Sequence, residues 1–433
     1  MLSISKIIFS GSLLFFTATL HAEVNLSSVA MNIDSKKINL HQAINKTFEH
    51  NPTLNVFSYS LKAYKGKQLQ ASLSASPEIS IVIEDALGSG NFNNTDNAQT
   101  TLGIAWVVEG ETRQRHIDVA NAGNLSLSAQ GNVKRLNAAA ETARLYINTL
   151  ANQARLKNAI KTVELAKATV AAVKKRVKAG KTPAAELSRA RAEMAQRQLD
   201  HEDVEHELIS SIRVLAAQWG KTQPSFTLVE GSIFKLPAII SFENLKTKFN
   251  QSPEFKRLIS EKHLREVELK LETSQSNSPW RVNLGVRHYE TTNDQALVAG
   301  ISIPFGERSR NKGRILEAQE NLSQSMAKAD ALKVQFETML YVLNTELQHA
   351  LHTVEAYRSK IIPQLEKALK ETRHAYNLGR YSYLEWSSVQ ADLLDARSAL
   401  IEASVNAHLK VIKIERLTGV PLLKPAAQTA GKS

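Results

Sequence analysis

Histidines at helical spacing are the side chains of this sequence that could bind a metal ion. His201 and His206 flank three carboxylates in the segment HEDVEH, and His349 and His352 lie three residues apart in HALH. Imidazole and carboxylate groups are common metal ligands, but two ligands on one helix rarely hold a metal without a third. A metal contact is one interpretation, and a solvated helix face is the one we adopt; no metal site is predicted.

Motifs for other chemistry are absent from the sequence. It contains no G-x-S-x-G, H-E-x-x-H, Walker or dinucleotide motif, so we predict neither an enzyme nor a bound cofactor. The lack of cysteine excludes thiolate metal sites and lipid attachment at an N-terminal cysteine. The net charge of +12 comes from cations interleaved with Glu along helices, which indicates solvated faces and no nucleic-acid partner.

The first 22 residues have the features of a secretory signal peptide. Lys6 precedes an apolar run from Ile7 to Leu20, and the small residue Ala22 marks a cleavage point. That run is shorter than the ~20 residues needed to cross a bilayer. No later apolar run reaches the ~18 residues expected of a membrane helix. We therefore expect export, and any insertion into a membrane would have to use strands.

Alternation of apolar residues predicts four strands, within the segments 77–108 and 280–305. The shared apolar face would comprise Ile79, Ile81, Ile83, Leu102, Ile104, Trp106, Val108, Val282, Leu284, Val286, Leu297, Ala299, Ile301, Ile303 and Phe305. The opposite face would carry Glu78, Ser80, Glu84, Arg281, Asn283 and Arg287. A soluble, half-buried sheet would show the same alternation, so the strands alone leave the environment open.

Two very long helices, 114–178 and 310–378, would position these strands. The first contains no proline and at 1.5 Å per residue would be about 98 Å long, far beyond ordinary globular helices. Pro363 predicts a kink or local unwinding in the second. Return helices are expected over 183–219 and 383–418. Apolar residues at alternating spacings of three and four on both sides of each break indicate antiparallel coiled-coil packing.

The chain is a duplicated unit. Gly180 and Gly379 end the long helices 199 residues apart, and Gly220 and Gly419 end the return helices at the same separation. Each tip glycine is expected to act as a left-handed helix cap. The first repeat is assigned to 23–220, the connector to 221–240, the second repeat to 241–420 and a flexible tail to 421–433. The predicted class is mainly α, with a small β part.

These features resemble the TolC family of bacterial outer-membrane efflux proteins, from about Asn39 to Val420. The strand-to-helix segments VVEGETRQRHI and IPFGERSRNKGRI and the tips VKAGKTPAAEL and YNLGRYSYLEW carry the resemblance. It implies a homotrimer in the outer membrane of a Gram-negative bacterium, with a twelve-stranded barrel among lipids and a helical tunnel in the periplasm. The implied partners are a periplasmic adaptor and an inner-membrane pump of the RND type. Independently, four strands cannot reach the smallest membrane barrel, of about 8 strands.

The resemblance also implies two sets of functional residues. The periplasmic gate would consist of Glu186, Glu385, Tyr376 and Arg380. The adaptor-docking tips would consist of Gly180, Lys181, Thr182, Pro183, Gly379, Arg380, Tyr381 and Ser382. Alternatives remain open: Glu385 fits a capping box, Glu186 a first-turn contact with the helix dipole, Tyr376 simple packing and Arg380 an exposed loop cation.

The predicted function is a passive outer-membrane exit duct, which takes its energy from the pump because the chain has no nucleotide site. The strand-to-helix segments resemble the heavy-metal cation branch most. Efflux of drugs and other small molecules, or type I secretion, is the alternative for the same fold. A periplasmic coiled-coil scaffold is the alternative of another class, but it leaves four amphipathic strands without a use.

Overall fold

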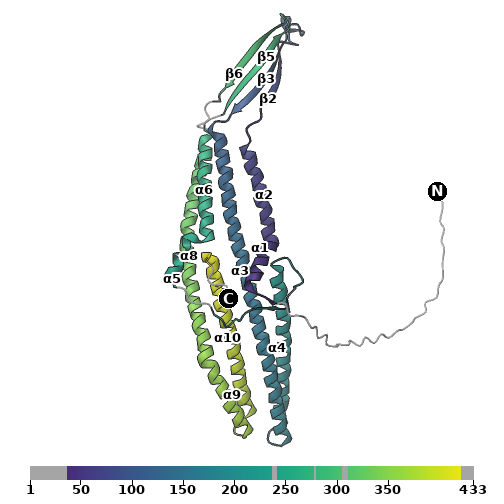
Figure 1. Ribbon diagram of the computed structural model, residues 1–433, viewed down its shortest axis with the longest axis vertical. Helices are drawn as coiled ribbons and strands as arrows, with labels where there is room; N and C mark the ends of the chain where they lie inside the picture. The colour runs from purple at the N-terminus through teal and green to yellow at the C-terminus, as the bar shows by residue number, and fades with distance from the viewer. Residues whose placement is uncertain (1–36, 237–240, 277–278, 305–310, 421–433) are drawn as a thin grey trace, which may run out of the picture. The chain divides into compact units, whose positions relative to one another are not determined.

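The computed structural model describes residues 37–236, 241–276, 279–304 and 311–420. The predicted signal peptide, Phe305 and the predicted tail at 421–433 lie outside these residues. Most of the described chain is helical, with one four-stranded sheet (Figure 1). The mainly α prediction with a small β part is therefore confirmed.

The helices before the connector are α1 (Leu40–His50), α2 (Pro52–Ser72), α3 (Glu111–Lys178) and α4 (Ala184–Ala217). Those after it are α5 (Phe242–Lys246), α6 (Pro253–Ser274), α8 (Lys312–Ala356), α9 (Ile362–Asn377) and α10 (Tyr383–Thr418). Short 3-10 turns occupy Gly90–Phe92 and Phe249–Gln251. None of the helices among the described residues is both long and apolar enough to cross a membrane.

Helix α3 runs for 68 residues without a break. Two glycines within it, Gly123 and Gly131, let α2 pack against its backbone. A Cβ atom at Gly123 would lie 1.7 Å from the Tyr64 hydroxyl oxygen, and one at Gly131 would lie 2.6 Å from the Phe57 ring. The glycines therefore serve close helix packing and do not interrupt the helix.

The corresponding long element of the second half is divided. Helix α8 passes into a π-helical turn, Tyr357–Ile361, which leads directly into α9. Pro363 lies at the start of α9, where it cannot donate a backbone hydrogen bond and its ring crowds the preceding turn. The local unwinding expected at the proline is accommodated by this wider turn.

The four-stranded sheet contains β2 (Glu78–Glu84), β3 (Gln99–Val108), β5 (Trp280–Tyr289) and β6 (Asp294–Ser302), antiparallel and in that order (Figure 1). Ile81 pairs with Leu102, Leu102 with Val286, and Val286 with Leu297, so the predicted apolar residues share one face. That face is exposed: Ile79 is 76% and Leu297 is 88% accessible. Within the described residues, no other element of the chain covers this face.

The opposite face of the sheet is held by charged side chains that reach over β3. Arg287 of β5 lies 2.7 Å from Glu84 of β2, and Arg281 pairs with Glu78 in the same way. The Arg287 guanidinium also donates to the Thr101 hydroxyl at 2.9 Å. This face is therefore polar and cross-linked, as the alternation predicted.

The buried core lies among the helices and not beneath the sheet. One cluster joins α1, α3, α4 and α10 to the connector, and a second joins α5, α8 and α10. The connector also contributes β4 (Leu228–Val229), which pairs in parallel with β1 (Lys37–Ile38). No pattern in the sequence predicted this short pair.

Side chains from α3 and α10 hold the connector and the adjoining β1 strand through hydrogen bonds to their backbone groups. The Tyr146 hydroxyl of α3 donates to the Ile38 and Glu230 carbonyls, and Gln153 exchanges two hydrogen bonds with the Val229 backbone. His408 of α10 bonds the Ile233 carbonyl at 3.0 Å. The segment between the two halves is thereby fixed to both of them.

Candidate functional site at the helix tips

Both helix breaks have the same backbone geometry. We call residues 170–192, around the α3–α4 turn, the first tip, and residues 369–391, around the α9–α10 turn, the second tip. Gly180 and Gly379 have φ angles of +65° and +78°, in the left-handed region that glycine adopts without strain. The amide after each glycine bonds the carbonyl five residues earlier, at 3.0 Å and 2.9 Å. Both breaks are Schellman caps.

The two return helices begin differently. Ser382 and Glu385 form a reciprocal capping box at the start of α10, and the Glu385 carboxylate accepts the Ser382 backbone N–H at 2.7 Å. Helix α4 begins at Pro183 without a side-chain cap. There the Thr182 hydroxyl donates to the Glu186 carboxylate instead. Glu385 is therefore engaged with its own helix end, whereas Glu186 is turned toward other elements.

Arg176, in the last turn of α3, connects the two tips. Its guanidinium donates to the carbonyls of Tyr376, which also accepts the Gly379 N–H, and of Asn377, both in the last turn of α9, and more weakly to that of Lys181. The guanidinium also lies over the Tyr376 ring, 4.7 Å from its centroid. A cation at a helix C-terminus is favoured by the helix dipole. Arg176 of the first tip thus caps the helix that enters the second tip.

Tyr376 joins α9 to α4. Its hydroxyl donates to the Glu186 carboxylate at 3.1 Å, and its ring packs 5.0 Å from the Trp386 ring. Both aromatic side chains are about 1% exposed, in a cluster with Val173, Ala190 and Tyr383. The first and second tips therefore share one small core, and Tyr376 is the point at which its polar and apolar contacts meet.

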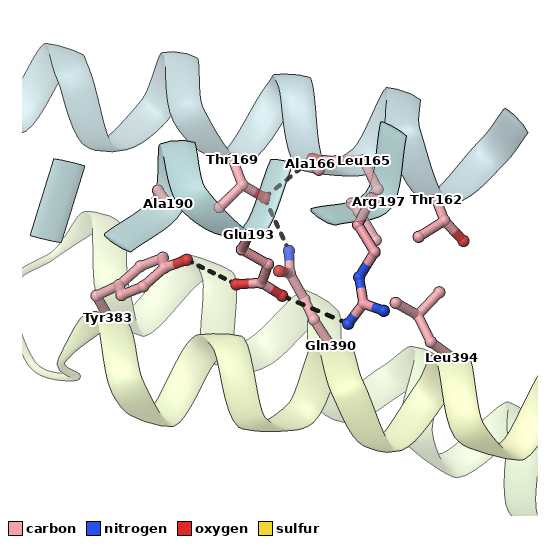
Figure 2. A pocket seen from close by; sticks show the side chains of 10 residues that line it. All are labelled: Thr162, Leu165, Ala166, Thr169, Ala190, Glu193, Arg197, Tyr383, Gln390 and Leu394. Atoms are coloured by element: carbon pink, nitrogen blue, oxygen red, sulfur yellow. Dashed lines mark hydrogen bonds and ion pairs between the residues drawn. The ribbon is translucent and has the colours of Figure 1, made fainter. Parts of the chain in front are cut away.

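A second set of polar contacts lies farther from the turns (Figure 2). The Tyr383 hydroxyl points to Glu193 and donates to its carboxylate at 2.9 Å, and Glu193 lies 3.9 Å from Arg197. Two turns farther along α10, the Gln390 amide donates to the Thr169 hydroxyl at 2.9 Å. Every one of these bonds except Glu193–Arg197 joins α10 to α3 or α4. They extend the link between the two hairpins.

Burial and hydrogen bonding shift the titration of three groups here. Burial raises the pKa of Tyr376 above its usual value of 10, and the Glu186 carboxylate raises it further. Burial and the Glu193 carboxylate likewise raise the pKa of Tyr383. The backbone N–H and hydroxyl of Ser382 lower the pKa of Glu385. At neutral pH both tyrosines are therefore hydrogen-bond donors and Glu385 is an acceptor.

The structure brings together some of the predicted site residues and separates others. Glu186 and Tyr376 are in direct contact, whereas Glu385 is not part of their network. Arg380 is exposed and makes no ion pair within the described residues. The other predicted tip residues, Lys181, Pro183, Tyr381 and Ser382, are also exposed, and Thr182 is half-buried. The gate and docking roles of these residues remain predictions.

Sequence reasoning did not single out Arg176, Glu193 or Tyr383 as site residues. Arg176 lies among Lys174, Lys175 and Lys178, and nothing local distinguishes it from them. Tyr383 and Glu193 are 190 residues apart, so their contact is visible only once the hairpins are packed. The one available signal was the occurrence of three tyrosines and a tryptophan near the second glycine, without counterparts near the first.

The histidines of HEDVEH and HALH do not converge. His206, His349 and His352 are exposed and His201 is half-buried. Within the described residues, no group of three or more His, Asp or Glu side chains is arranged to hold a metal ion.

Comparisons with known proteins agree with this architecture. Residues 43–221 match the family model described as outer membrane efflux protein. The chain is 23% identical to the cobalt-zinc-cadmium resistance protein CzcC of Cupriavidus metallidurans over 382 residues, covering 88% of this chain and 90% of that protein. It is 24% identical to the nickel and cobalt resistance protein CnrC of the same organism, covering 66% of this chain and 67% of CnrC.

Solved structures show the same fold. The crystal structure of CusC, described with its transmembrane channel formation, superposes with a TM-score of 0.73 at 15% identity, covering 89% of this chain and 92% of CusC. The outer membrane protein VceC of Vibrio cholerae superposes with a TM-score of 0.70 at 16% identity, covering 88% and 96%. The matched family model, the similarity to CzcC over most of both chains and the shared fold make the chain similar to the outer membrane efflux proteins.

Proposed function

We propose that three copies of this chain form the exit duct of a tripartite system that expels heavy-metal cations. In this arrangement the strands close a twelve-stranded barrel in the outer membrane, and the helices continue it as a tunnel through the periplasm. The duct is passive and receives its cargo from an inner-membrane pump of the RND type through a periplasmic adaptor. The observation that carries the proposal is the sheet, which has one exposed apolar face and one charged face.

The apolar face has the features of a lipid-facing surface. It ends at Val108 and Trp280 on the side of the helices, with Trp106 one position inside, and at Thr100, His288 and Gln295 on the other, so it forms a band with aromatic residues near one border. Membrane barrels present such a band to lipid and keep polar residues inside. The Glu–Arg pairs on the opposite face would then line a water-filled bore. A soluble protein would not leave so large an apolar face uncovered.

The edges of the sheet support a trimer. Strands β2 and β6 each pair on one side only within the described chain. Unpaired backbone groups are costly in lipid, so these edges must meet other strands. Three copies joined β6 to β2 would give twelve strands, enough for an open bore, whereas two would give eight, whose interior side chains fill.

The helices beneath the sheet support the same assembly. Helices α2, α3, α6 and α8 lie in the order of the strands that they adjoin. The two outer helices carry exposed apolar side chains: Val56 and Tyr59 on α2, and Val334 and Tyr341 on α8. Joining α8 of one copy to α2 of the next would cover both rows. The duplication inferred from the sequence would then produce a pseudo-sixfold wall from three chains.

The tips would form the closed periplasmic end and the docking rim. In this proposal two sets of contacts hold the second hairpin of each chain against the first. They are the Tyr376–Glu186 hydrogen bond and the hydrogen bonds from the Arg176 guanidinium to the carbonyls of the second tip. Glu385 and Arg380 would contribute charge to the mouth of the tunnel. The turns at Gly180 and Gly379 would dock the adaptor through Lys181, Thr182, Pro183, Tyr381 and Ser382.

The cargo is proposed from the relatives and not from a binding site. The similar proteins CzcC and CnrC are named for resistance to cobalt, zinc, cadmium and nickel. A duct needs only weak contacts with its cargo, since tight binding would slow passage. Drug efflux through the same fold is the competing outcome, which the test below separates from metal efflux.

The proposal is tested by the mass and conductance of the detergent-extracted protein and by metal tolerance. We expect a trimer that opens ion-conducting pores in planar bilayers. Deletion of the gene should lower tolerance to cobalt, zinc or cadmium, and the intact gene should restore it. A folded monomer without pores would contradict the channel. A trimeric pore whose loss changes drug tolerance and leaves metal tolerance unchanged would contradict the cargo.

A further inference from the structure

The two tips of each chain differ in charge. The first tip contains seven Lys and Arg residues and one carboxylate, Glu186. The second tip, its counterpart 199 residues later, contains three cations and two carboxylates. The imbalance is not hidden by internal pairing, because Lys174, Lys175, Lys178 and Lys181 are exposed and make no ion pair within the described residues.

The carboxylates near the turns are already engaged. Glu186 accepts hydrogen bonds from Tyr376 and Thr182, and Glu385 accepts them from Ser382. Arg176 is likewise occupied by the carbonyls of the second tip. The first tip therefore presents four lysine ammonium groups to solvent, with no carboxylate left to balance them.

The tips also differ in exposed apolar surface. The second tip exposes Leu378, Tyr381 and Leu384, at 56%, 47% and 56%. Between residues 161 and 198, which include the first tip, no large apolar side chain is exposed. Binding to an anionic membrane surface uses apolar side chains that enter the lipid, in addition to cations. The first tip lacks them, so its surface favours an acidic protein over lipid headgroups.

We propose that the first tip docks a carboxylate-rich protein surface through Lys174, Lys175, Lys178 and Lys181, while the second tip docks an apolar one. This inference rests on the proposed function, because it describes the adaptor surface that the tips would meet. The rim of a trimer would then alternate basic and apolar contacts. The basic contacts guide and orient the partner and weaken in salt, whereas the apolar contacts resist salt.

Polyglutamate of about 20 residues serves as the probe of an acidic protein surface, bound to the detergent-extracted full-length protein. The test variant replaces Lys174, Lys178 and Lys181 with Gln, which keeps the helix and removes the charge. The matched control replaces Lys157, Lys161 and Lys167, three exposed lysines of the same helix, with Gln. A second control, Leu378→Ser with Leu384→Ser, alters the second tip only.

We expect the first-tip variant to weaken polyglutamate binding by about tenfold at low salt, and both controls by less than about twofold. Raising the salt to 0.5 M should abolish the difference. Equal losses in the first-tip variant and the lysine control would overturn the inference, since binding would then follow net charge alone. Stronger binding to phosphatidylglycerol vesicles, lost in the same variant, would assign the tip to lipid and also overturn it.

Planar-bilayer conductance of the same preparations separates this inference from the proposed function. If the protein forms pores but its affinity for polyglutamate is the same in wild type and in the first-tip variant, only the charge assignment is contradicted. A protein that forms no pores contradicts the channel, whatever its tip binds.

Discussion

At the scale of single residues, the tips depend on long-range contacts made by a few side chains. Tyr376 keeps its ring in the core and places only its hydroxyl on Glu186. Arg176 of the first tip donates to two backbone carbonyls of the second tip, those of Tyr376 and Asn377. Each can be altered without removing the surrounding apolar contacts, so each permits a direct test of how the hairpins are held together.

Tyr376→Phe removes the hydroxyl and leaves the ring in place. Losing this hydrogen bond to a carboxylate should cost the closed arrangement about 1–2 kcal/mol, which corresponds to a roughly 5- to 30-fold increase in the open-to-closed ratio. Single-channel recordings should show more frequent or larger openings. Tyr381→Phe, at the exposed tyrosine of the same tip, is the control and should behave as wild type. Identical recordings from both variants would show that the hydrogen bond does not restrain opening.

Arg176→Met should loosen the end of α9. Hydrogen bonds from a charged donor contribute about 1.5–3 kcal/mol, and a lysine at this position could not reproduce the planar fork. The Gly379 and Arg380 amides, which close the Schellman cap, should exchange with deuterium at least tenfold faster. Lys175→Met is the control at the adjacent, exposed position. Unchanged exchange at the second tip would mean that the cap holds without Arg176.

At the scale of elements, local sequence signals and tertiary contacts contributed differently. Alternation predicted the four strands, and glycine spacing predicted both helix breaks. Both signals are local, because the pleat of a strand and the left-handed cap of a helix each depend on residues adjacent in sequence. The β1–β4 pair, the Tyr146 and Gln153 bonds to the connector, and the Tyr383–Glu193 contact join residues 76 to 191 positions apart. Single-sequence patterns carry no information about such distances. Pro363 indicated local unwinding, but not that a π-helical turn would accommodate it.

The connector gives a prediction about pH. His408 is buried, and burial lowers the pKa of its imidazole below 6.5. Full stability is therefore present above pH 6.5 and is lost as the pH falls, since the unfolded chain then binds a proton that the buried ring does not. Each unit of pKa difference is worth about 1.4 kcal/mol. Thermal unfolding at pH 7.5 and 5.5 measures the loss.

His408→Gln provides the comparison, because its amide can still donate to the Ile233 carbonyl and does not titrate in this range. We expect this variant to lose less stability than wild type between the two pH values. His349→Gln, at an exposed histidine, should follow wild type. If all three proteins lose the same stability between the two pH values, the pH dependence does not arise from the contact between His408 and the connector.

At the scale of the whole molecule, the two faces of the sheet decide where the chain can reside. Ile81 and Val82 are adjacent apolar residues of β2 that point to opposite faces. Ile81→Arg would place a charge toward lipid at a cost of about 2–4 kcal/mol, whereas Val82→Arg would face the water-filled bore. We expect the first variant to assemble poorly in the outer membrane and the second to assemble normally with altered ion selectivity. Membrane fractionation and conductance measure both effects, and equal insertion of the two variants would contradict the assignment of the faces.

The cross-strand pairs Glu78–Arg281 and Glu84–Arg287 also constrain the order of folding. Each pair joins residues 203 positions apart, one in each half of the chain. The pair reaches over β3, which lies between β2 and β5 in the sheet. Contacts at such separation form late, because the entropy of closing the intervening loop is lost before the contact is gained. Strands β2 and β3 can pair with each other early, because they are close in sequence, but the ion pairs from β2 to β5 can form only after the second half of the chain is available, so the polar face of the sheet is completed late.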